Sequence, residues 1–253
     1  METRTNISQP SADEVITISG VHKSFGENHV LRNFNVGLKR GENLVVLGKS
    51  GSGKSVLIKC IIGLIRPEQG SIKAFGQELV GMKREPLDKM RVRIGFLFQS
   101  NALYDSMTVR ENLQFPLRRH GKEKTHEEID ALVEEALGNV GLRHTIDMMP
   151  SELSGGMRKR IALARTLILK PEIILYDEPT TGLDPVTARE ISNLIVEVQH
   201  KYNTSAIIIS HDMNCVKLAS NRVVLLLDGA AYASGSWKEF SQSNDPKIKQ
   251  FFD

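Results

Sequence analysis

Several absences limit what this sequence encodes. Cysteine is scarce: the 253 residues include two, Cys60 and Cys215. Both lie in apolar stretches far apart in the chain, so we expect buried thiols and a reducing compartment rather than a disulfide. No apolar run approaches the ~18 residues that cross a bilayer, and the polar start of the chain has no apolar targeting core. We therefore expect a soluble chain that depends on another subunit for any membrane process.

A strong charge of one sign is also absent. The sequence has 33 Lys and Arg against 30 Asp and Glu, which gives a formal net charge of +3. Its basic clusters Lys39-Arg40, Arg118-Arg119-His120 and Arg158-Lys159-Arg160 are separate in sequence, and we interpret each as solvated surface. A nucleic-acid-binding protein concentrates positive charge on one face. The composition therefore predicts no nucleic-acid partner.

A glycine-rich octapeptide is the most informative feature that is present. It fits the pattern G-x-x-x-x-G-K-[ST] and lies between an apolar strand at 44–47 and a helix at 56–62. Its backbone amides can surround a phosphate, and the helix N-terminus adds partial positive charge. We expect Lys54 to reach the β- and γ-phosphates and the Ser55 hydroxyl to ligate Mg²⁺. The predicted ATP-binding residues are Gly48, Lys49, Ser50, Gly51, Ser52, Gly53, Lys54, Ser55 and Val56.

The distribution of periodicities predicts an α/β protein. Alternating stretches at 15–19 and 30–38 indicate a small N-terminal antiparallel sheet. Apolar strands at 173–176, 206–209 and 223–227 are separated by helices, which indicates a parallel sheet covered on both faces. Residues 1 to 13 are expected to be a flexible lead-in before a domain at 14–253. A helical subdomain is expected at about 100–170, with a capping box at Thr125 and Glu128.

Two adjacent carboxylates end the strand at 173–176. Ligands of parallel sheets bind at the carboxyl ends of the strands, so we interpret Asp177 as a ligand of the magnesium shell and Glu178 as the residue that orients or deprotonates the attacking water.

A second anion site is possible where Ser154, Gly155 and Gly156 open a helix, because Ser154 can cap it and the glycines expose bare amides. An ordinary capped helix start is the alternative. Asp184 precedes Pro185 and is predicted to cap the next helix.

Three further residues have two interpretations each. Gln99 follows a strand and either joins the magnesium-and-water shell or is a surface residue. His211 either contacts the γ-phosphate or is a turn histidine. Phe25 either stacks on adenine or belongs to the core. The residues alone leave these alternatives open.

In order and spacing, these elements resemble the ABC-type ATPase subunit over nearly the whole chain. The resemblance rests on the glycine loop, Gln99, the Leu-Ser-Gly-Gly-Met signature at 153–157, Ile-Leu-Tyr-Asp-Glu-Pro at 174–179, Gly-Leu-Asp-Pro at 182–185 and Ser-His-Asp at 210–212. It implies a P-loop NTPase fold, ATP and Mg²⁺ as cofactors, and a head-to-tail dimer. The signature residues then close over the partner's ATP, Asp184 communicates between the two sites, and His211 senses the γ-phosphate. Phe25 stands where the family often has tyrosine.

A narrower resemblance is to the ATPases of phospholipid transporters that work with MCE proteins. It rests on the stretches 54–59, 98–109, 111–112, 115–118, 156–160 and 245–252. It implies a membrane permease and an MCE-domain protein as partners, a place at the cytoplasmic face of the inner membrane, and phospholipid transport between bacterial membranes. Ala102, Leu103, Tyr104 and Met107 are the expected apolar docking residues. The alternatives are another ABC system, for amino acids, lipoproteins or cell-envelope remodelling, or a soluble ABC protein acting on nucleic acid.

Overall fold

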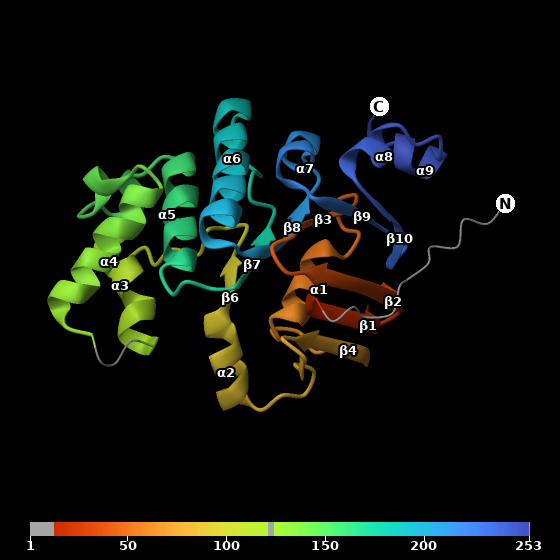
Figure 1. Cartoon of the computed structure of the whole chain (residues 1–253), viewed down its shortest axis with the longest axis horizontal. Coiled ribbons are helices and arrows are strands. Elements are labelled where there is room, and N and C mark those ends of the chain that lie inside the picture. The colour runs from red at the N-terminus through yellow and green to blue at the C-terminus, as the bar shows by residue number, and fades with distance from the viewer. Residues whose placement is uncertain (1–12, 121–123, 253) are drawn as a thin grey trace.

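The computed structural model describes residues 13–120 and 124–252. The chain is built around two sheets, with one group of helices beside the larger sheet (Figure 1). Of the flexible lead-in expected at residues 1 to 13, all but Asp13 lies outside the described residues. In the described ranges, no helix combines the length and apolarity needed to cross a membrane.

The N-terminal region forms the predicted antiparallel sheet, whose strand order is β2-β1-β4-β5. Its strands are β1 (Glu14–Phe25), β2 (Asn28–Lys39), β4 (Gln69–Ala74) and β5 (Gln77–Glu78). Ile16 pairs with Leu38 on one side and with Ala74 on the other, and all three side chains are buried. The alternation of apolar and polar residues along these strands therefore buries one face of this sheet in the core.

The larger sheet has the strand order β10-β9-β3-β8-β7-β6, and its strands are parallel except for β10. The strands are β3 (Asn43–Leu47), β6 (Ile94–Leu97), β7 (Ile173–Asp177), β8 (Ser205–Ser210), β9 (Arg222–Leu227) and β10 (Ala230–Gly235). The predicted parallel sheet is confirmed.

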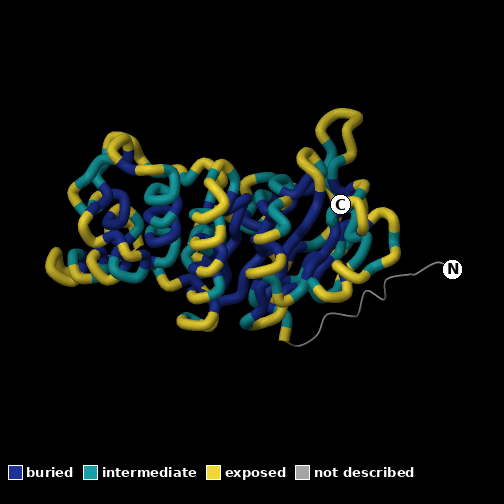
Figure 2. Tube along the Cα trace, turned by 90° about the horizontal axis from the view of Figure 1, so that it is seen from above, coloured by how far each residue is buried: buried dark blue, intermediate teal, exposed yellow. Residues whose placement is uncertain are grey.

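Alternate residues of the central strands feed two separate cores. Val45 and Leu47 of β3 pack into one apolar cluster, and Leu44 and Val46 pack into the other. The tube in Figure 2 is buried along these strands. Because both faces are covered, these strands are continuous apolar runs rather than alternating ones.

Helices cover the two faces of the larger sheet. They are α1 (Lys54–Ile61), α2 (Arg84–Arg93), α6 (Pro185–Tyr202) and α7 (Met213–Ala219). The α2 helix was not predicted, because Met90 is its one buried residue and the segment has no clear apolar periodicity. The C-terminal part adds α8 (Trp237–Ser241) and α9 (Pro246–Lys249).

Three helices between β6 and β7 form the left-hand end of the molecule in Figure 1. They are α3 (Val109–His120), α4 (His126–Asn139) and α5 (Gly155–Leu167), with 3₁₀ turns at Arg143–Thr145 and Pro150–Glu152. The predicted capping box of α4 is present, with Glu128 and Thr125 exchanging side chain-to-backbone hydrogen bonds. The apolar face of α4 is buried at Ile129, Val133 and Leu137.

Candidate functional site

The glycine-rich loop joins β3 to α1 and has the strand–loop–helix context that its pattern requires. Gly53 has a φ of 101°, and a Cβ there would lie 2.6 Å from the Val30 side chain. Glycine is therefore required at this position for conformation and for space. Gly53 is also the N-cap of α1 and makes no side-chain cap bond, so the first amides of α1 are available to an anion.

A cavity of about 290 Å³ opens beside this loop. The predicted residues that line it are Phe25, Ser50, Gly51, Gly53, Lys54, Ser55, Val56, Gln99, Glu178 and His211, and Val30 completes the lining. These residues come from β1, β2, the glycine loop with the start of α1, and the loops after β6, β7 and β8. The fold therefore brings six separate segments of the chain to one cavity.

The Glu178 carboxylate lies between two nitrogen groups. Its Oε1 is 3.4 Å from Lys54 Nζ, and its Oε2 is 2.8 Å from His211 Nδ1. Lys54 Nζ also donates to the carbonyl oxygens of Gly48, at 2.8 Å, and Lys49, at 3.0 Å. Glu178 is 7% exposed and has a φ of 50°, in the left-handed region that costs a side-chain residue energy. Such backbone conformations cluster at functional sites.

Ser55 and Asp177 supply oxygen atoms next to this carboxylate. The Ser55 hydroxyl donates to Asp177 Oδ1 at 2.8 Å, and Asp177 is 4% exposed. Burial raises the pKa of Asp177, and the Ser55 hydrogen bond and the charges of Lys59 and Lys54 oppose that shift. Hydroxyl, carboxylate and amide oxygens suit a hard cation such as Mg²⁺. Among the described residues, no group of three or more His, Cys, Asp and Glu side chains could hold a metal ion.

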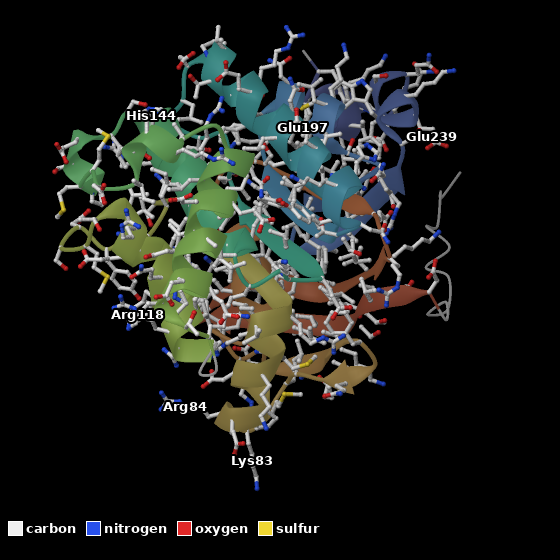
Figure 3. The ribbon with its side chains drawn as sticks, turned by 60° about the vertical axis from the view of Figure 1, so that its left-hand side comes forward. Lys83, Arg84, Arg118, His144, Glu197 and Glu239 are labelled. Atoms are coloured by element: carbon white, nitrogen blue, oxygen red, sulfur yellow. The ribbon has the colours of Figure 1, made fainter. Side chains whose placement is uncertain are left out.

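The basic clusters were predicted to be solvated surface, and this prediction is wrong for Lys159, which is buried. Lys39, Arg40, Arg118, Arg119 and His120 are exposed, and Figure 3 shows Arg118 pointing outward.

Lys159 itself is 2% exposed, and its Nζ donates to the Gln99 carbonyl oxygen at 2.9 Å. Sequence reasoning missed this residue. The available signal is helical spacing, because the buried Ala162 and Leu163 follow three and four residues later on the same face.

Some predicted residues do not line the cavity: Gly48, Lys49 and Ser52 of the glycine loop, Asp177, and the helix-start residues Ser154, Gly155, Gly156 and Asp184. Ser154 caps α5 by accepting a hydrogen bond from the Met157 amide, and Gly155 and Gly156 form the first turn of that helix. Asp184 caps α6 through the amides of Val186 and Thr187, as predicted. A Cβ on Gly156 would lie 2.6 Å from Thr187 Cγ2. One chain alone therefore leaves these groups outside the cavity.

Phe25 lies at the end of β1 with 51% of its surface exposed. The interpretation of Phe25 as a core residue is therefore wrong. Its ring lines the cavity, and the Lys23 ammonium lies 5.0 Å from the ring centroid. Stacking on adenine remains a prediction.

A second groove, of about 570 Å³, runs along α3, α5 and β6. Ala102 and Tyr104 line it, together with Phe115. Leu103 instead packs partly buried against the core, and Met107 does not line the groove. Two of the four expected docking residues therefore face this groove.

The fold and the cavity define a P-loop nucleoside triphosphatase. The family described as "ABC transporter" matches residues 31–181, which is more than half of the chain. This chain belongs to that family, as an ABC-type ATPase.

Its relatives are named for different transport systems. It is 39% identical over 93% of its length to the "Probable ribonucleotide transport ATP-binding protein mkl" of Mycobacterium tuberculosis, of which it spans 66%. It is 38% identical over 89% of its length to the "Intermembrane phospholipid transport system ATP-binding protein MlaF" of Haemophilus influenzae, of which it spans 85%. It is 36% identical over 96% of its length to "Methionine import ATP-binding protein MetN 1" of Acinetobacter baylyi, of which it spans 68%.

Among solved structures, the chain is similar to the dimeric post-hydrolysis state of the ATP-binding cassette MJ0796 bound to ADP and Pi. The TM-score is 0.80 at 30% identity, with 87% of this chain and 98% of that chain covered. The fold prediction, a P-loop ATPase with an N-terminal antiparallel sheet, is confirmed.

Proposed function

We propose that the cavity beside the glycine loop is the site of ATP hydrolysis and that Glu178 is its general base. The observation that carries this proposal is the position of the Glu178 carboxylate, between Lys54 Nζ and His211 Nδ1 at the cavity wall. A carboxylate held next to a phosphate-binding loop is placed to orient a water molecule for in-line attack on the γ-phosphate.

The loop and α1 would bind the triphosphate. Backbone amides of residues 48–56 and the Lys54 ammonium stabilise its charge, and Phe25 stacks on the adenine. Lys54 Nζ now bonds to the Gly48 and Lys49 carbonyl oxygens. Binding of a phosphate therefore requires Lys54 to exchange at least part of these contacts for phosphate oxygens.

Mg²⁺ would be held by Ser55, Asp177 and Gln99. The 2.8 Å hydrogen bond between Ser55 and Asp177 already brings two of these oxygen donors together. The cation would neutralise charge on the β- and γ-phosphates. Burial raises the pKa of Asp177 in the chain without the cation, and a divalent cation would favour the ionised carboxylate instead.

Glu178 would orient the attacking water and accept its proton. His211 bonds to Glu178 Oε2 and is 54% exposed at its side chain, so it can turn toward the γ-phosphate. Gln99 lines the same wall and would hold the water or the cation. During hydrolysis the water oxygen bonds to the γ-phosphorus, and the bond to the bridging oxygen of ADP breaks.

A second copy of the chain would complete the site. Ser154, Gly155 and Gly156 form the start of α5 outside their own cavity, and a head-to-tail partner would direct the N-terminal amides of its α5 at this chain's ATP. Asp184 lies at the N-terminus of the neighbouring α6 and would connect the two sites. The dimeric form of the MJ0796 cassette supports this arrangement.

Phosphate release from Mg-ATP by the purified chain tests the proposed hydrolysis. We expect turnover that requires both Mg²⁺ and Glu178, together with heat of binding when Mg-nucleotide is added. Folded chain that neither binds Mg-ATP nor releases phosphate would refute the proposal.

We further propose that hydrolysis drives phospholipid transport between bacterial membranes, with this chain at the cytoplasmic face of the inner membrane. The support is the similarity to MlaF over 85% of that protein and the stretches shared with ATPases that work with MCE proteins. Similar identities to the ribonucleotide and methionine proteins keep another ABC system as the alternative.

A membrane permease would dock in the groove lined by Ala102, Tyr104 and Phe115. Tyr104 is 43% exposed and Phe115 is 36% exposed, and their ring centroids lie 5.0 Å apart. Exposed aromatic side chains in a groove favour a partner that buries them.

Purification of the tagged chain from native membranes, followed by protein and lipid identification, tests the transport proposal. We expect a permease, an MCE-domain protein and phospholipid. Recovery of an amino-acid permease with its binding protein would favour an amino-acid transport system. A gel-shift assay with nucleic acid tests the alternative of a soluble ABC protein that acts on nucleic acid.

A further inference from the structure

The segment that follows β6 is attached to α5 by two cationic side chains. Lys159 Nζ donates to the Gln99 carbonyl oxygen at 2.9 Å. Arg165, six residues further along the same helix, donates to the Asn101 carbonyl oxygen at 3.2 Å. One helix therefore holds two backbone carbonyls of the loop that carries Gln99 into the cavity.

This loop does not have a conformation that its own residues favour. Asn101 and Ala102 have φ values of 64° and 51°, and both belong to the left-handed region. Two successive non-glycine residues there cost energy that contacts elsewhere must offset. The Asn101 side-chain oxygen is buried and has no hydrogen-bond partner among the described residues. The bonds from α5 are therefore among the contacts that keep the loop in place.

The burial of Lys159 is itself unfavourable. Burial lowers its pKa to about 8, and the charge of Asp177 acts in the opposite direction. An apolar side chain of similar length would fill the same space without desolvating an ammonium group. The ammonium is thus better explained by what it contacts, Gln99 and the charge of Asp177, than by packing.

We propose that Lys159 is a positioning residue for Gln99. By holding the Gln99 carbonyl oxygen to α5, it fixes the direction in which the Gln99 side chain enters the cavity. It also ties that direction to the helix whose first turn contains Gly155 and Gly156. This inference rests on the proposed ATP hydrolysis at the cavity. Lys159 thus affects turnover by positioning Gln99, and it does not contact ATP itself.

A double-mutant cycle in kcat and KM for Mg-ATP tests the inference, with Lys159→Met, Gln99→Ala and the double variant. Lys159→Met should lower kcat about tenfold, because a small misplacement of a catalytic group costs this much or more, while KM changes less than about twofold. In the Gln99→Ala background, Lys159→Met should change kcat by less than about twofold, because the residue through which it acts is already gone.

Arg160→Met is the matched control, because Arg160 lies on the same helix but contacts Val140 and Glu190 instead of the loop. It removes the same charge and should leave kcat unchanged. Urea unfolding of each variant separates loss of stability from loss of turnover. If Lys159→Met does not fold, Lys159→Gln, whose shorter amide cannot reach as far, provides the same cycle.

The outcomes separate the inference from the proposed function. Wild-type chain that does not hydrolyse Mg-ATP would refute the proposed function. Active wild-type chain in which Lys159→Met keeps its kcat, or lowers kcat equally with and without Gln99, would overturn the role of Lys159.

Discussion

The Ser55 hydroxyl donates to Asp177 Oδ1 at 2.8 Å, although 122 positions separate the two residues in sequence. Ser55 is in the first turn of α1, and Asp177 ends β7. The hydrogen bond joins the glycine loop to the acidic strand end. Asp177 immediately precedes Glu178 in the chain, and the charge of Glu178 acts on Asp177, so two proposed magnesium ligands and the proposed base belong to one site.

Replacement of Glu178 by Gln should stop hydrolysis without preventing nucleotide binding. Glu178→Gln keeps the size of the side chain but removes the basic oxygen, and loss of a general base lowers kcat by about 10² or more. Phosphate-release kinetics and calorimetry with Mg-ATP measure the two effects. Glu172→Gln is the control, because Glu172 is an exposed glutamate outside the cavity. Near-normal turnover of Glu178→Gln would contradict the assigned role.

Replacement of Lys54 by Ala should weaken nucleotide binding. The Lys54 ammonium is 5% exposed and bonds to two loop carbonyl oxygens. A charge-assisted hydrogen bond contributes roughly 1.5–3 kcal/mol, so Lys54→Ala should raise the Kd for ATP by about tenfold or more. Titration calorimetry measures it, with Lys73→Ala on the exposed side of β4 as the control. An unchanged Kd would rule out contact between Lys54 and the phosphates.

A methyl group on Gly156 should weaken the ATP-dependent dimer. The added Cβ would also meet Thr187 Cγ2 within the same chain, so Thr187→Ser is included to remove that clash. In the Glu178→Gln background, Gly156→Ala with Thr187→Ser should raise the dimer dissociation constant about tenfold. Thr187→Ser alone should not. Sedimentation with Mg-ATP measures it, and equal dimerisation would refute the proposed role of Gly156 across the interface.

Truncation of Phe115 should reduce recovery of the permease. Phe115→Ala removes an exposed ring from the groove but leaves the ATP cavity untouched. Copurified permease should fall about tenfold, while ATP hydrolysis by the isolated chain stays unchanged. Leu218→Ala, at an exposed apolar residue outside the groove, serves as the control. Full recovery with Phe115→Ala would exclude this groove as the docking site.

Both cysteines should resist thiol reagents until the chain unfolds. Burial raises the pKa of Cys60 and of Cys215 from 9.0 to about 11. At pH 8 the thiolate fraction should then be about 100-fold lower than for an exposed cysteine. Burial also blocks access of the reagent to the sulfur atom. Because the raised pKa belongs to the folded state, this contribution to stability is complete below pH 9 and is lost as the pH rises through about 11. Reaction with a chromogenic disulfide and urea unfolding at several pH values measure both effects. Fast reaction of the folded chain would contradict the burial.

Local sequence patterns predicted many of the helices and strands, but they predicted fewer of the contacts between residues that are distant in the chain. The capping box at Thr125 and Glu128 was readable because both partners lie within one turn. The α2 helix was not, because its single buried residue, Met90, leaves no periodic apolar face. Phe25 was ambiguous because an aromatic side chain at a strand end suits a core as well as a ligand.

The glycine loop, the caps of α5 and α6 and the buried strands follow from the amino-acid sequence, because each depends on residues that are neighbours in the chain. The positions of Glu178 between Lys54 and His211, and of buried Lys159 against Gln99, arise only from the packing of distant segments. The strand order β3-β8-β7-β6 brings these residues together. Spacing along the chain does not encode which strand ends meet at one edge of a sheet, because the packing of the whole core selects that order.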